Sequence, residues 1–230
     1  GRLNGSYGQW IDFLVGCTDA DKETQVFLKC ILLWRKILNL DVQVDSEASH
    51  FLTLDKQLHP ILFGRIFGIK VLTAHTQTEI QELIEQMEDR ISNEPTHVTE
   101  LLYEPAVQAL VTGNVVHRAL LAKHEAKINQ IQFWYHLSQV AIHRVHQSKV
   151  LIESKQYLKA RIVLDSIPYG HIRHGYREFI ELYVAFFRWY IAKSLNEPSV
   201  ELEHEFNLRK TKLNYPIFGG AYFERYFDEN

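Results

Sequence analysis

The sequence predicts an all-α protein, an array of antiparallel helix pairs with no β-sheet. Three observations support this prediction. Glycine and proline are sparse, at 11 and 6 of 230 residues, which favours long helices over a turn-rich β fold. Apolar residues recur at helical spacing through most of the chain. In the C-terminal half a helix, a short polar turn and a second helix recur roughly every 40 residues, as in helical-repeat arrays.

The first 50 residues predict two helices and a polar connection. A short helix over residues 7–16 ends at Gly16. A stronger helix begins near Thr18, where acidic residues favour the positive end of the helix dipole. Residues 39–50 form the polar connection. The apolar face of the second helix is predicted at Val26, Phe27, Cys30, Leu33, Trp34 and Ile37.

Two further helices are expected over residues 59–74 and from Thr76 or Thr78 to Ile91. The first contains Pro60 near its start, because proline is tolerated best in a first helical turn. It also contains Gly64 and Gly68, one turn apart, so a neighbouring helix is expected to approach closely there. Residues 92–96 are a clear break.

The rest of the chain predicts helices over residues 96–103 and 106–110, with Pro105 between them, and an end at Gly113. Residues 115–154 then form a helical pattern too long for one globular helix, and a break is predicted within 123–129, where charged residues crowd together. Further helices are predicted over residues 134–152, 157–167, 174–195, 200–213 and 216–228.

Composition limits the possible classes of protein. With 46% hydrophobic and 12% aromatic residues the chain has ample material for a core. Its net charge of -3 argues against nucleic-acid binding by this chain alone, and no apolar run is long enough for a membrane helix. Cys17 and Cys30 are expected to be buried free thiols in a reduced cytoplasm. We expect an N-terminal helical bundle part, residues 1–94, packed as one continuous domain with a helical-repeat part, residues 95–230.

Residues 128–143 are the most informative stretch, because they contain no Lys, Arg, Asp or Glu in a chain that is 23% charged. On a helix their polar residues lie along one face, and an apolar face of Ile131, Trp134, Leu137, Ala141 and Val145 adjoins it. A face of amides and imidazoles suits a partly buried surface or a groove that holds another backbone. We call this polar face the neutral stripe: Asn129, Gln132, His136, Gln139, His143 and His146.

A family resemblance rests on the following segment. The run Gln156-Tyr-Leu-Lys-Ala-Arg-Ile-Val-Leu resembles the second helix of a tetratricopeptide (TPR) unit, in which a large aromatic residue precedes a small alanine by three positions. Residues 115–230, which end with Gly219-Gly220-Ala-Tyr-Phe-Glu-Arg-Tyr-Phe, resemble the C-terminal helical-repeat region of the Rgg/RRNPP group of peptide-responsive regulators of Gram-positive bacteria. The resemblance implies a TPR-like α-solenoid, a short peptide ligand, a homodimer, and transcriptional control through a DNA-binding part outside this chain.

The stripe suggests how an extended peptide is bound. Asn and Gln each carry a donor and an acceptor, so they can bind unpaired backbone groups without burying a charge. Arg118 and Arg144 are predicted to hold a carboxylate such as a peptide C-terminus, and Tyr135 and Trp134 to supply apolar pockets. The alternative is a buried seam between helices or protomers. The predicted clamp is Asn129, Gln132, His136, Gln139 and His143.

Other chemistries find little support in the sequence. His143 and His146 are three residues apart, a spacing that can bind zinc, but packing or groove roles are favoured because no HExxH or cysteine cluster accompanies them. There is no GxSxG motif and no glycine-rich phosphate loop, so neither an enzyme nor a cofactor site is predicted. The sequence therefore predicts a non-catalytic, peptide-sensing regulatory domain; the alternative function is a helical protein–protein scaffold.

Overall fold

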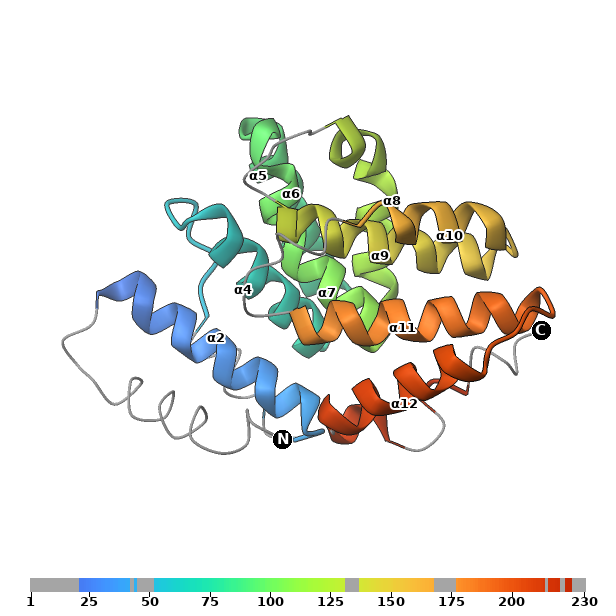
Figure 1. Ribbon diagram of the computed structural model, residues 1–230. Helices are drawn as coiled ribbons and strands as arrows, with labels where there is room; N and C mark the ends of the chain where they lie inside the picture. Colours follow the sequence, from blue (N-terminus) through green and yellow to red (C-terminus); the bar gives the residue numbers. More distant parts are fainter. Residues whose placement is uncertain are drawn as a thin grey trace.

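The computed structural model describes residues 21–41, 44, 52–130, 137–167, 177–213, 215–219 and 222–224. Over these ranges the fold is all-α and contains no strand, which confirms the predicted class (Figure 1). The predicted helix at residues 7–16 and Cys17 lie outside the described residues. The elements are α2 (Lys22–Leu38), α4 (Pro60–Thr73), α5 (Gln77–Asn93), η1 (Pro95–His97), α6 (Val98–Leu101), α7 (Tyr103–Thr112), α8 (Val115–Gln130), α9 (Leu137–Glu153), α10 (Tyr157–Asp165), α11 (Arg177–Ser194), α12 (Val200–Leu213) and η3 (Pro216–Phe218).

Helix α2 begins at the N-cap residue Asp21, whose carboxylate accepts from the backbone N–H of Thr24 at 3.0 Å. Its buried face includes Cys30, Leu33 and Trp34, as the apolar spacing predicts. Cys30 is a free, buried cysteine, and burial raises the pKa of its thiol to about 12. It is therefore an unreactive core residue.

Helix α4 is the centre of the N-terminal half and packs against α2, α5, α6 and α7. It begins at Pro60, as predicted, and is buried on almost every side. A Cβ atom at Gly64 would collide with the carbonyl of Leu101, and one at Gly68 with the side-chain amide of Gln108. These contacts confirm that the two glycines permit the close approach of neighbouring helices.

The boundary between α6 and α7 differs from the prediction. Pro105 does not separate two helices but lies in the first turn of α7, where its missing N–H has no helical partner to lose. The break falls instead at Leu102. The end of α7 is as predicted, with Gly113 in the left-handed conformation at φ 71° and its N–H bonded to the Ala109 carbonyl at 3.0 Å.

The predicted break within residues 123–129 was wrong, because α8 continues to Gln130. The charged residues there form a helix face that pairs with α5. Lys123 Nζ and His124 Nε2 lie 2.8 and 3.1 Å from Glu88 Oε1. The charge cluster therefore marks an interhelical contact. Residues 131–136, between α8 and α9, lie outside the described residues.

The C-terminal half contains two antiparallel helix pairs, α9 with α10 and α11 with α12 (Figure 1). In the first pair Ala160 is fully buried, and its carbonyl accepts from the Ser148 hydroxyl at 3.5 Å. This is the close contact that a small residue at that position predicts. A regular superhelical repeat stays a prediction.

Aromatic side chains hold the chain end against the rest of the fold. Phe186 of α11 packs against Phe206 and Phe223, with ring centroids 5.2 and 4.8 Å away. The Tyr222 hydroxyl donates to the Val111 carbonyl of α7 at 2.6 Å. The predicted helix over residues 216–228 is, in the described part, only the short η3, because the chain extends again at Gly219. None of the described helices is long and apolar enough to cross a membrane.

Candidate functional site

A pocket of about 290 Å³ lies between α8 and α9 and is the strongest candidate site in the described part of the chain. Both helices contribute polar and apolar side chains, a combination typical of ligand pockets. We call it the α8–α9 groove. Its lining residues are Arg118, Ala119, Leu121, Ala122, Glu125, Ile128 and Asn129 from α8, and His143, His146, Gln147 and Val150 from α9.

Two side-chain bridges show that α8 and α9 run antiparallel along the groove. At one end Arg118 Nη2 donates to Glu153 Oε2 at 2.6 Å. Further along, Gln147 Nε2 donates to Glu125 Oε1 at 3.2 Å. The later residue of α8 thus pairs with the earlier residue of α9. The N-terminal end of α8 therefore lies beside the C-terminal end of α9.

The groove brings together three of the predicted ligand-binding residues, Arg118, Asn129 and His143. They are far apart in the sequence but line one pocket because the two helices are antiparallel. Asn129 is exposed and His143 is buried. The neutral stripe is thus not one continuous helix face, because Asn129 ends one helix and His143 belongs to the next.

The other predicted residues are placed as follows. Arg144 does not line the groove; its guanidinium donates to the Ser166 carbonyl at the end of α10. Its position therefore gives it a capping role. Gln139 belongs to α9, and its side chain lies outside the described part of the structure. The predicted residues outside the described ranges are Gln132, Trp134, Tyr135 and His136.

His143 contributes to both the groove and the interhelical packing. Its Nε2 lies 3.2 Å from the Thr99 carbonyl of α6, so this nitrogen carries the hydrogen and donates. Burial, opposed by this hydrogen bond, lowers the pKa of His143 to about 4. The ring is therefore neutral at pH 7, and its Nδ1 is an acceptor. This contact agrees with the seam alternative for that one residue.

His146 has an unusual environment among the groove residues. It is only 7% exposed, and its Nε2 has no hydrogen-bond partner in the described structure. Burial, together with Lys149, His143 and Arg118, lowers its pKa to about 3. A neutral, buried imidazole without a partner at this nitrogen costs free energy unless a ligand or water satisfies it. His146 belongs to the neutral stripe, but the predicted clamp did not include it.

The sequence analysis missed two polar groove residues, Glu125 and Gln147, and Glu153, which lies beside the groove and pairs with Arg118. These residues can be found only when α8 and α9 are aligned as antiparallel helices. That alignment was not possible from the sequence, because the break between the two helices was predicted at the wrong place. As for metals, the described residues contain no group of three or more side chains suited to hold an ion.

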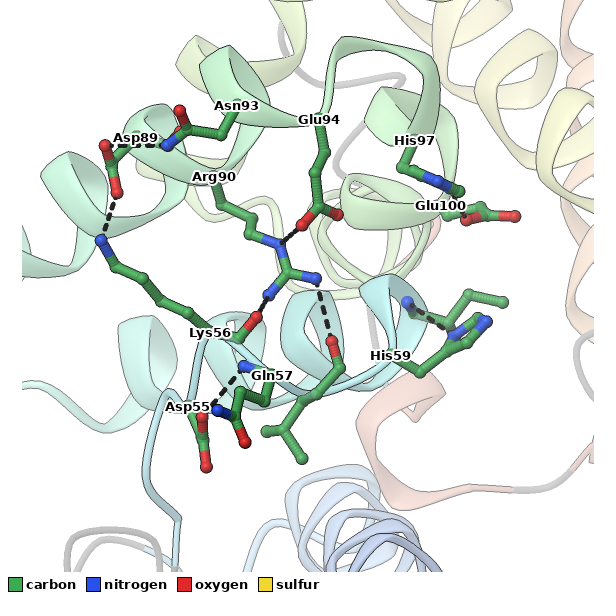
Figure 2. A network of polar contacts seen from close by, with 12 residues as sticks. Asp55, Lys56, Gln57, His59, Asp89, Arg90, Asn93, Glu94, His97 and Glu100 are labelled. Carbon is green, nitrogen blue, oxygen red and sulfur yellow. Dashed lines mark hydrogen bonds and ion pairs between the residues drawn. The ribbon is translucent and has the colours of Figure 1, made fainter.

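A second polar cluster has a different character (Figure 2). Arg90 of α5 lies against the segment before α4, and its side chain is only 6% exposed. One terminal nitrogen donates to the Lys56 carbonyl, the other to the Leu58 carbonyl at 3.0 Å, and Nε lies 2.9 Å from Glu94 Oε1. We call this set the Arg90 clasp. Two guanidinium nitrogens donate to backbone carbonyls of another segment, and Nε has an ion-pair contact but no hydrogen bond, so the clasp has a structural role.

Comparison with known proteins found no matching protein-family model, curated protein or solved structure.

Proposed function

We propose that this chain is a non-catalytic recognition domain that binds a short peptide in the α8–α9 groove. The observation that supports the proposal best is the convergence of Arg118, Asn129 and His143 on one pocket. An extended peptide has unpaired N–H and C=O groups along its length. The Asn129 amide and the imidazole of His146 supply donors and acceptors for such groups without adding charge.

The groove is also partly apolar. Leu121, Ile128 and Val150 line it, so a peptide side chain bound there would leave water while the polar residues fix its backbone. Peptide binding in a pre-formed groove needs no reaction chemistry. In this proposal the domain is cytoplasmic and homodimeric, and it controls transcription through a DNA-binding part outside this chain. The peptide acts by favouring one arrangement of the helices over another.

The experiment is selection from a synthetic library of three- to eight-residue peptides on the immobilised chain, followed by calorimetry with the enriched sequences. Binding is expected to weaken about tenfold in Asn129→Ala, because one side-chain amide with two hydrogen-bonding functions is lost. Asn114→Ala is unsuitable as a control because Asn114 caps α8, accepting from Val116 and His117. The matched control is Asn207→Ala, because Asn207 is an exposed asparagine on α12 that does not line the groove. Equal affinity for Asn129→Ala and wild type, or no enriched peptide, would contradict the proposal.

The second candidate function is a helical scaffold that binds another protein without a small ligand. One observation favours it: Leu158 and Ile162, four residues apart on α10, are 63% and 70% exposed. Under this function the peptide library yields nothing. Where the bound protein is a second copy of this chain, the double change Leu158→Glu and Ile162→Glu would then lower the sedimentation coefficient by separating the copies, while leaving the thermal stability unchanged.

A further inference from the structure

The end of the groove near Arg118 contains an ion pair whose two side chains are partly exposed to solvent. Arg118 Nη2 lies 2.6 Å from Glu153 Oε2, and the two side chains are 39% and 29% exposed. Lys149 Nζ lies 3.4 Å from the other oxygen, Glu153 Oε1. Arg118 lines the groove, whereas Glu153 lies beside it at the end of α9. The carboxylate of Glu153 thus pairs with a guanidinium, that of Arg118, which faces the pocket.

This ion pair is easy to open. Partly exposed pairs contribute little to stability, because water competes for both partners. The described hydrogen bond uses one of the nitrogens of Arg118, although a guanidinium has five N–H groups and can hold a carboxylate with two parallel bonds. A carboxylate that entered from the groove could therefore replace Glu153 with better geometry.

An independent observation in the same groove also points to a ligand. His146 lines the pocket, is more than nine-tenths buried, and has no partner for Nε2. Arg118 is among the groups that lower the pKa of His146, so its guanidinium lies near this ring within the groove. This nitrogen is covered from solvent, so a ligand reaches it only when the ring turns toward the groove, where the neutral imidazole with hydrogen on Nε2 can donate to a carboxylate oxygen.

We infer that Glu153 is an internal placeholder, and that the carboxylate of the ligand displaces it from Arg118 and accepts a hydrogen bond from His146. This inference rests on the proposed function and adds the class and orientation of the ligand. The ligand is a peptide with a free C-terminal carboxylate. The C-terminus lies at Arg118, and the peptide chain runs along the groove toward Asn129.

Displacement of Glu153 by the ligand predicts an effect that attraction of the ligand to Arg118 alone does not. Glu153→Gln removes the competing carboxylate and keeps the size of the side chain. The affinity for a peptide acid is therefore expected to rise about fivefold to tenfold, because no ion pair has to be opened and a like charge is removed. Arg118→Ala is expected to lower the same affinity at least tenfold.

The test compares free-acid and C-terminally amidated versions of one peptide library on wild type and Glu153→Gln, with calorimetry on the selected sequences. The control is Glu197→Gln, which removes the carboxylate from the similarly exposed pair Arg161–Glu197 outside the groove. We expect acids to bind wild type about tenfold more tightly than the matching amides. Glu153→Gln is expected to strengthen the binding of acids only, and Glu197→Gln to change neither. If Glu153→Gln fails to fold, Glu153→Asp, which shortens the reach to Arg118 but keeps the charge, is used, and a smaller rise in the affinity for acids is expected.

The outcomes separate this inference from the proposed function. Peptides that bind equally well as acids and amides overturn the inference and leave peptide binding in place. Weaker binding of acids to Glu153→Gln overturns the placeholder role. If neither library yields a binder, the proposed function fails and this inference with it. Acetate and butyrate form a separate arm, and if they bind wild type as tightly as the peptide acids do, the carboxylate does not come from a peptide.

Discussion

The Arg90 clasp and the α8–α9 groove both use an arginine that reaches across to another segment, yet their surroundings differ. Arg90 has a side chain that is 6% exposed, and each of its guanidinium nitrogens faces an oxygen. Arg118 has a side chain that is 39% exposed and a described bond to one carboxylate, and His146 in the same groove has a nitrogen without a partner.

The difference separates a structural role from a recognition role. Polar groups that are buried and bonded to a neighbouring segment hold segments together, and the loss of one partner leaves the others unpaired. Polar groups that line a pocket and are incompletely satisfied can still gain hydrogen bonds from a ligand. Changes in the clasp are therefore expected to affect folding, and changes in the groove to affect binding.

The largest effect is expected for Arg90→Ala. It leaves the Leu58 carbonyl and the Glu94 carboxylate without their partner and removes the cation that lies 5.2 Å from the centre of the Phe63 ring. The free energy of unfolding is expected to fall by about 3 kcal/mol. Urea denaturation measures this, and Arg118→Ala, expected to cost less than about 1 kcal/mol, is the comparison. Equal losses for the two variants would remove the distinction between clasp and groove.

The next effect is a dependence of stability on pH that comes from the groove. The folded-state pKa values of His143 and His146 are lowered to about 4 and about 3. In the unfolded chain both pKa values are about 6.5, so between pH 6.5 and 4 the unfolded chain binds protons that the folded chain does not. Stability is therefore complete above pH 6.5 and falls as the pH is lowered, by about 1.4 kcal/mol per pH unit for each histidine.

Urea denaturation at pH 7 and pH 5 measures this loss. His117 on α8, which is fully buried with its pKa lowered to about 3 by burial, adds to the same slope. The slope is expected to be smaller in His146→Leu than in wild type. An unchanged slope in that variant would show that His146 is not held neutral in the folded protein.

A smaller effect on stability at pH 7 is expected for His146→Leu. The change removes a buried nitrogen without a partner and replaces it with an apolar group, so the free energy of unfolding is expected to stay within about 1 kcal/mol of wild type or to rise. Thermal denaturation measures the stability, and calorimetry with a selected peptide measures binding, which is expected to weaken. A marked loss of stability would place His146 with the clasp residues and favour the seam alternative.

The sequence predicted those parts of the fold that depend on local chemistry. Pro60 marks the start of α4, Gly113 the end of α7, and Asp21 lies in the acidic stretch where α2 begins. Gly64 and Gly68 were predicted to permit close packing, because a residue without a side chain lets a neighbouring helix approach its backbone. These features depend on backbone conformation or steric size, and both are determined by the type of residue alone.

The errors arose where a tertiary contact determines the structure. The charged residues Lys123 and His124 suggested a turn, but Glu88 from α5 satisfies them within one continuous helix. Arg144 is next to His143 in sequence, yet one caps α10 and the other bonds to α6, because adjacent residues of a helix point in different directions. The pair of Glu153 with Arg118 could not be predicted before α8 and α9 were known to be antiparallel.

The central claim is that the α8–α9 groove holds the peptide, and filling the groove tests it most directly. Ala122 is exposed and lines the groove, whereas Ala126, one turn further along α8, is exposed and outside the lining. A tryptophan at either position remains at the surface, so neither Ala122→Trp nor Ala126→Trp is expected to change stability by more than about 0.5 kcal/mol. Calorimetry with a peptide selected on wild type is expected to show no measurable binding to Ala122→Trp and normal binding to Ala126→Trp. Equal binding to both variants would contradict the claim.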